Sequence, residues 1–92
     1  DPSPYIEKAF YLPHDLKKGM RSDFVKTLQE GLIKLGFPLV SGATGFFGDE
    51  TENAVKNFQK EYEKTILMSI GLKQPTGFCG QKTREKLHEL LY

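Results

Sequence analysis

An internal repeat is the feature that most constrains how this chain can fold. The segment Thr44–Thr51 returns as Thr76–Thr83, 32 residues later, with threonine, glycine, phenylalanine, glycine and threonine at matching places. The apolar residues that follow also correspond, since Val55 is matched by Leu87. Self-similarity at such a period indicates a duplicated supersecondary unit. We therefore expect one structural device, a turn that leads into a helix, to be used twice.

Each position that matches between the two copies has an expected physical role. The first glycine, Gly45 or Gly77, supplies a turn geometry that a side chain would obstruct. The phenylalanine after it can anchor the turn in the core, and Gly48 or Gly80 then acts as a helix N-cap. The last threonine falls in the first helical turn, where its hydroxyl can bond a nearby backbone group. These phenylalanines and threonines are Phe46, Phe78, Thr51 and Thr83.

Three amphipathic helices are predicted. The first begins after the N-cap Ser22, carries apolar residues at helical spacing and stops at Gly36. The second runs from about Asp49 to Tyr62 and the third from about Gln81 to Leu91. The residues expected to face inward on the second and third helices are Thr51, Ala54, Val55, Phe58, Tyr62, Thr83, Leu87, Leu90 and Leu91.

Two long loops join these helices. The first covers Phe37–Phe47, and the second, richer in apolar residues, covers Ile66–Phe78. Short extended pieces at Gly45–Phe47 and Gly77–Cys79 could pair weakly, but no sheet is expected. The predicted fold is therefore all-α, a three-helix bundle with two long loops.

The beginning of the chain has a different character. Prolines punctuate it and no helical period appears, so residues 1–14 are predicted to be a linker or N-terminal arm before a domain of residues 15–92. The arm is too apolar for a free tail, and part of it is expected to pack on the domain. Its large apolar residues are Tyr5, Ile6, Phe10, Tyr11 and Leu12.

Composition excludes several classes of function. Thirteen basic and twelve acidic side chains leave a formal charge of +1, without the basic excess typical of nucleic-acid binding. No apolar run approaches the roughly 18 residues of a membrane span, so membrane insertion is not expected. The single cysteine, Cys79, excludes an internal disulfide and a cysteine-rich zinc site.

No constellation of residues predicts catalysis or a cofactor. Asp49 and its acidic neighbours complement a helix dipole, and the two histidines, His14 and His88, lack zinc-ligand spacing. Cys79 takes the place of Phe47 in the repeat, which favours a packed and inert thiol. The alternative is a thiolate assisted by the helix that follows. We predict a protein that is not an enzyme and that holds neither metal nor cofactor.

The order of several motifs resembles the peptidoglycan-binding domain family, over about Leu16–Leu91. The motifs are Leu28-Gln29, Leu35-Gly36-Phe37, Gly45-Phe46-Phe47-Gly48 with Thr51, Phe58-Gln59, and Thr76-Gly77-Phe78 with Gly80 and Thr83. This resemblance implies a closed bundle of three helices. It also implies a bacterial, non-catalytic module, extracytoplasmic or secreted, that holds an attached hydrolase or envelope protein on the cell wall.

Ligand recognition is expected at the two repeat turns. Sugars stack on exposed aromatic faces, and a helix N-terminus can hold a carboxylate such as the end of a stem peptide. The candidate ligand-binding residues are Phe46, Phe47, Asp49, Asn53, Phe78, Gln81 and Arg84. The phenylalanines could instead be core residues, and the glycan strand and the stem peptide both stay open as ligands. Gln29 and Gln59 are expected to bond loop backbone.

Two other functions compete with wall binding. A protein-interaction or scaffolding bundle could have kept the fold without a murein ligand, with a partner surface formed by the arm and Ile66–Leu72. An autoinhibitory prodomain would use Cys79 to block a protease, but the residues that flank this cysteine do not fit such a motif.

Overall fold

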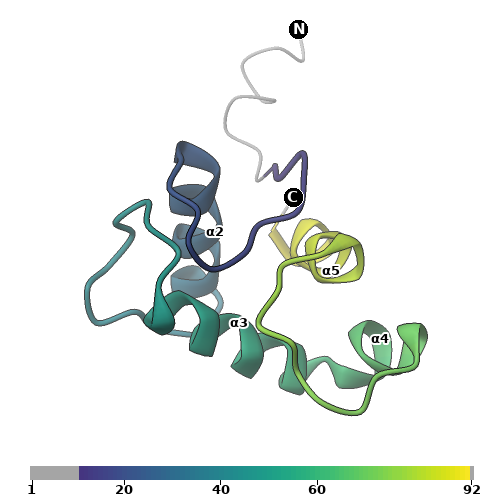
Figure 1. The fold of residues 1–92 in the computed structure, drawn as a ribbon. Helices are drawn as coiled ribbons and strands as arrows, with labels where there is room; N and C mark the ends of the chain where they lie inside the picture. Colours follow the sequence, from purple (N-terminus) through teal and green to yellow (C-terminus); the bar gives the residue numbers. More distant parts are fainter. Residues whose placement is uncertain (1–10, 92) are drawn as a thin grey trace, which may run out of the picture.

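Three helices form the framework of the computed structural model, which describes residues 11–91 (Figure 1). They are α2 (Asp23–Lys34), α3 (Asp49–Glu61) and α5 (Gln81–Leu91). The predicted all-α class is confirmed, and the helix bounds agree with the expected ones to within a residue or two. Among the described residues the only β-type pairings are two isolated bridges.

Helix α2 begins and ends at the residues that its sequence indicates. The Ser22 hydroxyl accepts a hydrogen bond from the Val25 amide at 3.2 Å, which satisfies one of the donors left free at a helix start. At the other end Gly36 has a φ of +95°. The Phe37 amide then reaches back to the Leu32 carbonyl at 2.8 Å, the hydrogen bond of a Schellman motif.

The core lies where the inner faces of α2, α3 and α5 meet. Phe58 is fully buried at its centre, and the Phe37 ring packs edge-on against it with centroids 5.6 Å apart. Leu90 was expected to face inward but is exposed, because α5 turns only Thr83, Leu87 and part of Leu91 toward the other helices. The buried apolar residues are Leu12, Leu16, Val25, Leu28, Leu32, Leu39, Phe47, Ala54, Val55, Phe58, Ile66, Leu67, Cys79 and Leu87.

The second predicted loop is partly helical. The short helix α4 (Glu63–Ile66) ends at the first residue of this loop and packs near α5, and the 3₁₀ turn η1 (Met68–Ile70) lies within the loop (Figure 1). Ile66 and Leu67 are both buried in the core. Elements of three or four residues are too short to produce a helical period in the sequence, so the loop prediction was wrong for this stretch.

The segment before α2 ties the two repeats together. It runs from α5 across to α2 (Figure 1), and its Leu16 exchanges two backbone hydrogen bonds with Cys79, at 2.8 and 3.0 Å. Further along, the Phe47 amide donates to the Met20 carbonyl at 2.8 Å. The two extended pieces therefore pair with this segment and not with each other, which corrects the expected pairing.

Part of the predicted arm packs on the domain as expected, because Leu12 is buried. Tyr5, Ile6 and Phe10 lie outside the described residues, and the division between residues 14 and 15 stays a prediction. Within the described part of the chain, no helix is both long and apolar enough to cross a bilayer.

Candidate functional site

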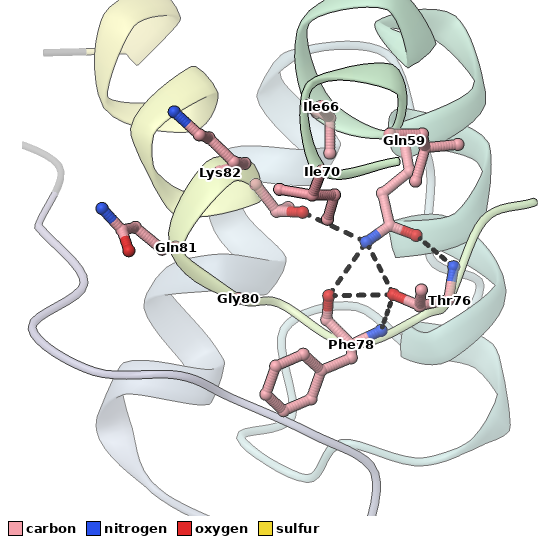
Figure 2. Close-up of a pocket in the computed structure, with 10 residues that line it drawn as sticks. Gln59, Ile66, Ile70, Thr76, Phe78, Gly80, Gln81 and Lys82 are labelled. Atoms are coloured by element: carbon pink, nitrogen blue, oxygen red, sulfur yellow. Dashed lines mark hydrogen bonds between the residues drawn. The ribbon is translucent and has the colours of Figure 1, made fainter. Parts of the chain in front are cut away.

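A buried glutamine organises each repeat turn. The Gln59 side chain, on α3, accepts hydrogen bonds from the Thr76 and Gly77 amides, both at 2.9 Å. Its amide nitrogen donates to the Phe78 carbonyl at 2.9 Å and to the Thr83 hydroxyl at 3.1 Å (Figure 2). The glutamine thus replaces the backbone partners that a turn of this shape cannot find within itself.

Gln29, on α2, repeats the arrangement at the first turn. Its side chain accepts from the Gly45 amide at 2.7 Å and donates to the Phe46 carbonyl at 2.9 Å. The expectation that both glutamines bond loop backbone is confirmed. The expected threonine role was wrong, because the Thr51 and Thr83 hydroxyls accept from the glutamine side chains and bond no nearby backbone.

The phenylalanines of the repeat divide between core and surface. Phe47 is completely buried, and this overturns its prediction as a ligand contact. Phe46 and Phe78 are each 40% exposed, so they do not anchor the turns in the core as expected. Successive side chains alternate along extended backbone, and one residue of each pair must point outward. Cys79 takes the inward place in the second copy.

Each exposed phenylalanine ring lies against the glycine that precedes the next helix. A Cβ added to Gly80 would meet a Phe78 ring carbon at 3.0 Å, and one added to Gly48 would meet Phe46 at 2.9 Å. The second glycine of each repeat therefore leaves room for the ring and also stands directly before the first residue of the helix. This close approach holds one face of each ring beside a helix N-terminus, with part of the ring in solvent.

A pocket of about 220 Å³ opens beside the second turn, and we call it the Gln59 pocket. Gln59 and Thr83, which are buried, form its base, Ile66, Leu67 and Ile70 form an aliphatic wall, and Phe78, which is partly exposed, lies at its mouth. Figure 2 shows Ile70 and Phe78 beside Gln59. Among the described residues that line the pocket, Lys82 is the only charged one. The described residues that line it are Gln59, Ile66, Leu67, Ile70, Thr76, Phe78, Gly80, Gln81, Lys82 and Thr83.

The first turn has a corresponding but acidic pocket of about 320 Å³, which we call the Gln29 pocket. Asp49 and Glu50 line it, at the repeat positions of Gln81 and Lys82. The Glu50 carboxylate accepts a hydrogen bond from the Ser41 amide at 3.1 Å. Duplication has therefore produced two pockets of similar construction and opposite charge.

The remaining predicted site residues lie apart from the Gln59 pocket. Asp49 forms an exposed ion pair with Lys18, and this contact lowers the pKa of the Asp49 carboxyl. Arg84 pairs with Asp15 at 2.8 Å and so fastens the segment before α2. Asn53 is exposed on α3 and lines neither pocket.

The Gln59 pocket thus brings together two of the predicted residues, Phe78 and Gln81. The prediction missed Ile66, Ile70 and Lys82, which complete its walls. Lys82 could have been found from the repeat itself, because it stands opposite Glu50 and reverses the charge there. No pattern in the sequence brings η1 next to the start of α5.

The one cysteine has no access to a substrate. Cys79 is completely buried, and this burial raises the pKa of its thiol to about 12. The prediction of a packed cysteine is confirmed. The alternative of a reactive thiolate is wrong, because such a thiolate has to be exposed. Across residues 11–91, no three His, Cys, Asp or Glu side chains are grouped to hold a metal ion.

Comparison with known proteins identifies the family. Residues 21–87 match the family described as "Putative peptidoglycan binding domain", and the chain belongs to that family. The matched range contains both turns, both glutamines and both pockets. The predicted resemblance is thereby confirmed.

Two curated proteins are similar in sequence. The type VI secretion system spike protein VgrG3 of Vibrio cholerae serotype O1 is 54% identical over 94 residues, which covers 98% of this chain and 9% of the spike protein. A probable N-acetylmuramoyl-L-alanine amidase of Bacillus licheniformis is 51% identical over 47 residues, covering 50% of this chain and 13% of the amidase. The chain therefore corresponds to about a tenth of the length of these relatives.

Two crystal structures share the fold. The SleB N-terminal domain superposes with a TM-score of 0.69 at 28% identity, and the match covers 87% of this chain and 96% of that domain. A peptidoglycan-binding protein from Clostridioides difficile, in complex with glutamine hydroxamate, gives a TM-score of 0.66 at 36% identity. That match covers 83% of this chain and 41% of the other protein.

Proposed function

We propose that this chain is a non-catalytic module that binds peptidoglycan and holds an attached protein at the cell wall. The observation that carries the proposal is the family match over residues 21–87, because it spans the two turns and their pockets. The relatives support the attachment, since one is a secretion spike protein and the other a probable wall amidase. Such a module acts outside the cytoplasm, in the envelope or after secretion.

Phe78 and Gln81 are the ligand contacts that we place first. Phe78 offers a partly exposed ring face, and Gln81 an exposed amide, at the mouth of the Gln59 pocket. Phe46, Asp49, Asn53 and Arg84 stay predictions for a second contact surface. The pocket is shallow and small, so a single site binds weakly, and tethering to a larger protein raises the effective affinity.

Sedimentation with purified sacculi tests this function directly. We expect the 92-residue chain to sediment with sacculi, and Phe78→Ala to release it. Phe24→Ala is the matched control, since the Phe24 ring is similarly exposed, at 38%, and lines neither pocket. Amide shifts with soluble muropeptides should gather at residues 66–84. A folded chain that neither sediments nor shifts at millimolar muropeptide would refute wall binding.

The protein-interaction alternative has one observation in its favour. Met68, Ile70 and Leu72 expose 63%, 51% and 37% of their surfaces on the segment that follows α4. This is the part of the chain predicted as a partner surface. If muropeptides leave the spectrum unchanged, this apolar edge becomes the place to search for a protein partner.

A further inference from the structure

We infer that the Gln59 pocket binds the carboxylate-terminated end of a short peptide with small apolar residues, and not a sugar. The inference rests on the proposed function and names the part of the wall that is recognised. It follows from the walls of the pocket, from the charge at its rim and from its size.

The walls offer apolar contact and few free polar groups. Ile66, Leu67 and Ile70 form one side, and Phe78 is the only aromatic ring among the lining residues. The amide of Gln59 at the base is already bonded to the turn backbone and to Thr83. Sugar hydroxyls placed there would lose water without gaining partners, which is unfavourable. Methyl groups need no hydrogen-bond partners, so they can occupy the pocket without this cost.

The rim selects a negative charge. Within residues 11–91, Lys82 is the only charged residue that lines the pocket, and the first turn of α5 contains no acidic side chain. At the Gln29 pocket the same two positions are Asp49 and Glu50. A carboxylate is therefore favoured at the second turn and repelled at the first.

The protein already shows these rim groups holding a carboxylate. One turn along α5, outside the pocket lining, Glu85 accepts a hydrogen bond from the Gln81 amide at 3.0 Å and pairs with Lys82 at 3.5 Å. The Gln81 and Lys82 side chains can thus converge on one carboxyl group. The Lys82–Glu85 pair is exposed, so exchanging Glu85 for a ligand carboxylate costs little.

The size of the pocket favours the end of a chain. At about 220 Å³ it is smaller than the roughly 300–1,000 Å³ of pockets that enclose drug-sized ligands. A terminal residue or two fits this space, whereas a glycan segment would have to lie across its mouth.

A titration with three probes tests the inference. The probes are N-acetyl-Lys-D-Ala-D-Ala with a free carboxylate, the same peptide as its C-terminal amide, and a peptide-free chitooligosaccharide. We expect saturable amide shifts at Ile66, Ile70 and Lys82 with the free acid, roughly tenfold weaker binding of the amide, and no shifts in the pocket with the sugar. Equal binding of acid and amide, or sugar shifts in the pocket, would overturn it.

Variants of two equivalent ion pairs distinguish a loss of charge at the pocket from a loss of folding. Lys82→Gln should weaken binding of the free acid roughly tenfold and leave the amide unaffected. Lys60→Gln is the control, because Lys60 makes the same i,i+3 pair, with Glu63, away from the pocket. Glu85→Gln frees Lys82 and should strengthen binding of the acid. Lys82→Gln binding like the wild type would contradict the assignment.

Sacculi stripped of stem peptides by an amidase distinguish this inference from the proposed function. The chain should sediment with intact sacculi and stay in solution with stripped ones. Equal sedimentation with both would overturn the peptide site and leave wall binding in place. Binding of the free peptide without sedimentation of intact sacculi would support the pocket and refute the wall function.

Discussion

At the scale of single residues, the side chains of Gln29 and Gln59 supply hydrogen-bond partners that other backbone groups usually supply. Both are almost completely buried, and each satisfies the donors and acceptors of a turn far along the chain. A buried amide is tolerated here because its oxygen and its nitrogen both have hydrogen-bond partners. The turns also depend on these side chains, because the buried Gly45 and Gly77 amides donate their hydrogen bonds to them.

Replacing Gln59 by methionine should expose this dependence. Gln59→Met keeps the size of the side chain but leaves the Thr76 and Gly77 amides without their acceptor. We expect a loss of about 2–4 kcal/mol in the free energy of unfolding, measured by urea titration. Gln29→Met should cost a similar amount. A change of only a few tenths in either variant would show that water reaches these groups.

Cys79 should resist thiol reagents while the chain is folded. Burial removes access and raises the pKa of the thiol to about 12, so very little thiolate exists at pH 8. Labelling should be at least about a hundredfold slower than in urea. Because the chain has only one cysteine, the modified fraction can be read by mass spectrometry. Rapid labelling without denaturant would contradict the core position.

The repeated turn is the element on which both pockets depend. Its first glycine has a positive φ, +87° at Gly45 and +77° at Gly77, as the repeat predicts. Its second glycine leaves room for the phenylalanine ring. What differs between the copies is the neighbouring segment: α4 and η1 build an aliphatic wall at the second turn, while the first is lined by small and acidic residues.

Two alanine substitutions, one inside the second turn and one just after η1, separate backbone strain from crowding. Gly71 and Gly77 have nearly the same φ, but a Cβ at Gly71 meets nothing within 4 Å, whereas one at Gly77 lies 2.6 Å from Glu52 Cγ. Gly71→Ala should cost about 1 kcal/mol and Gly77→Ala clearly more, by urea unfolding. Adding Glu52→Ala should remove most of the extra cost of Gly77→Ala, because only Lys56 Cε, at 3.1 Å, then stays close to the new Cβ. Equal costs in the single variants would rule out crowding.

At the scale of the whole molecule, residues 12–22 close the bundle. Leu12 and Leu16 are buried, Asp15 pairs with Arg84, and the Leu12 amide donates a hydrogen bond to His88 Nε2 at 3.0 Å. A ring nitrogen accepts a hydrogen bond only when it carries no proton. This hydrogen bond, one of the contacts that dock the segment on α5, therefore requires His88 to be unprotonated at Nε2.

Acid should loosen this docking. Burial and the nearby Arg84 charge lower the pKa of His88 below its usual 6.5, and Glu85 opposes them only in part. The folded chain thus binds fewer protons than the unfolded chain, so this contribution to stability is complete above pH 6.5. It is lost as the pH falls through the lowered pKa.

Hydrogen exchange of the Leu12 amide at pH 7 and pH 5 measures the effect locally. After correction for intrinsic exchange, protection should fall at pH 5. His88→Gln keeps an acceptor but cannot titrate in this range, and it should remove most of the pH dependence. If the variant and the wild type change equally, the carboxylates and not His88 set the acid response.

Local patterns in the sequence determined the three helices, their ends, the doubled turn and the bonding of its glutamines. Each of these follows from residues a few positions apart, or from a repeat that can be read along the chain. Only the tertiary structure decided that Phe47 is buried while Phe46 is exposed, that η1 walls one pocket, and that residues 12–22 pair with both turns. These features depend on contacts between distant segments, where burial selects one partner among several that local preference would allow.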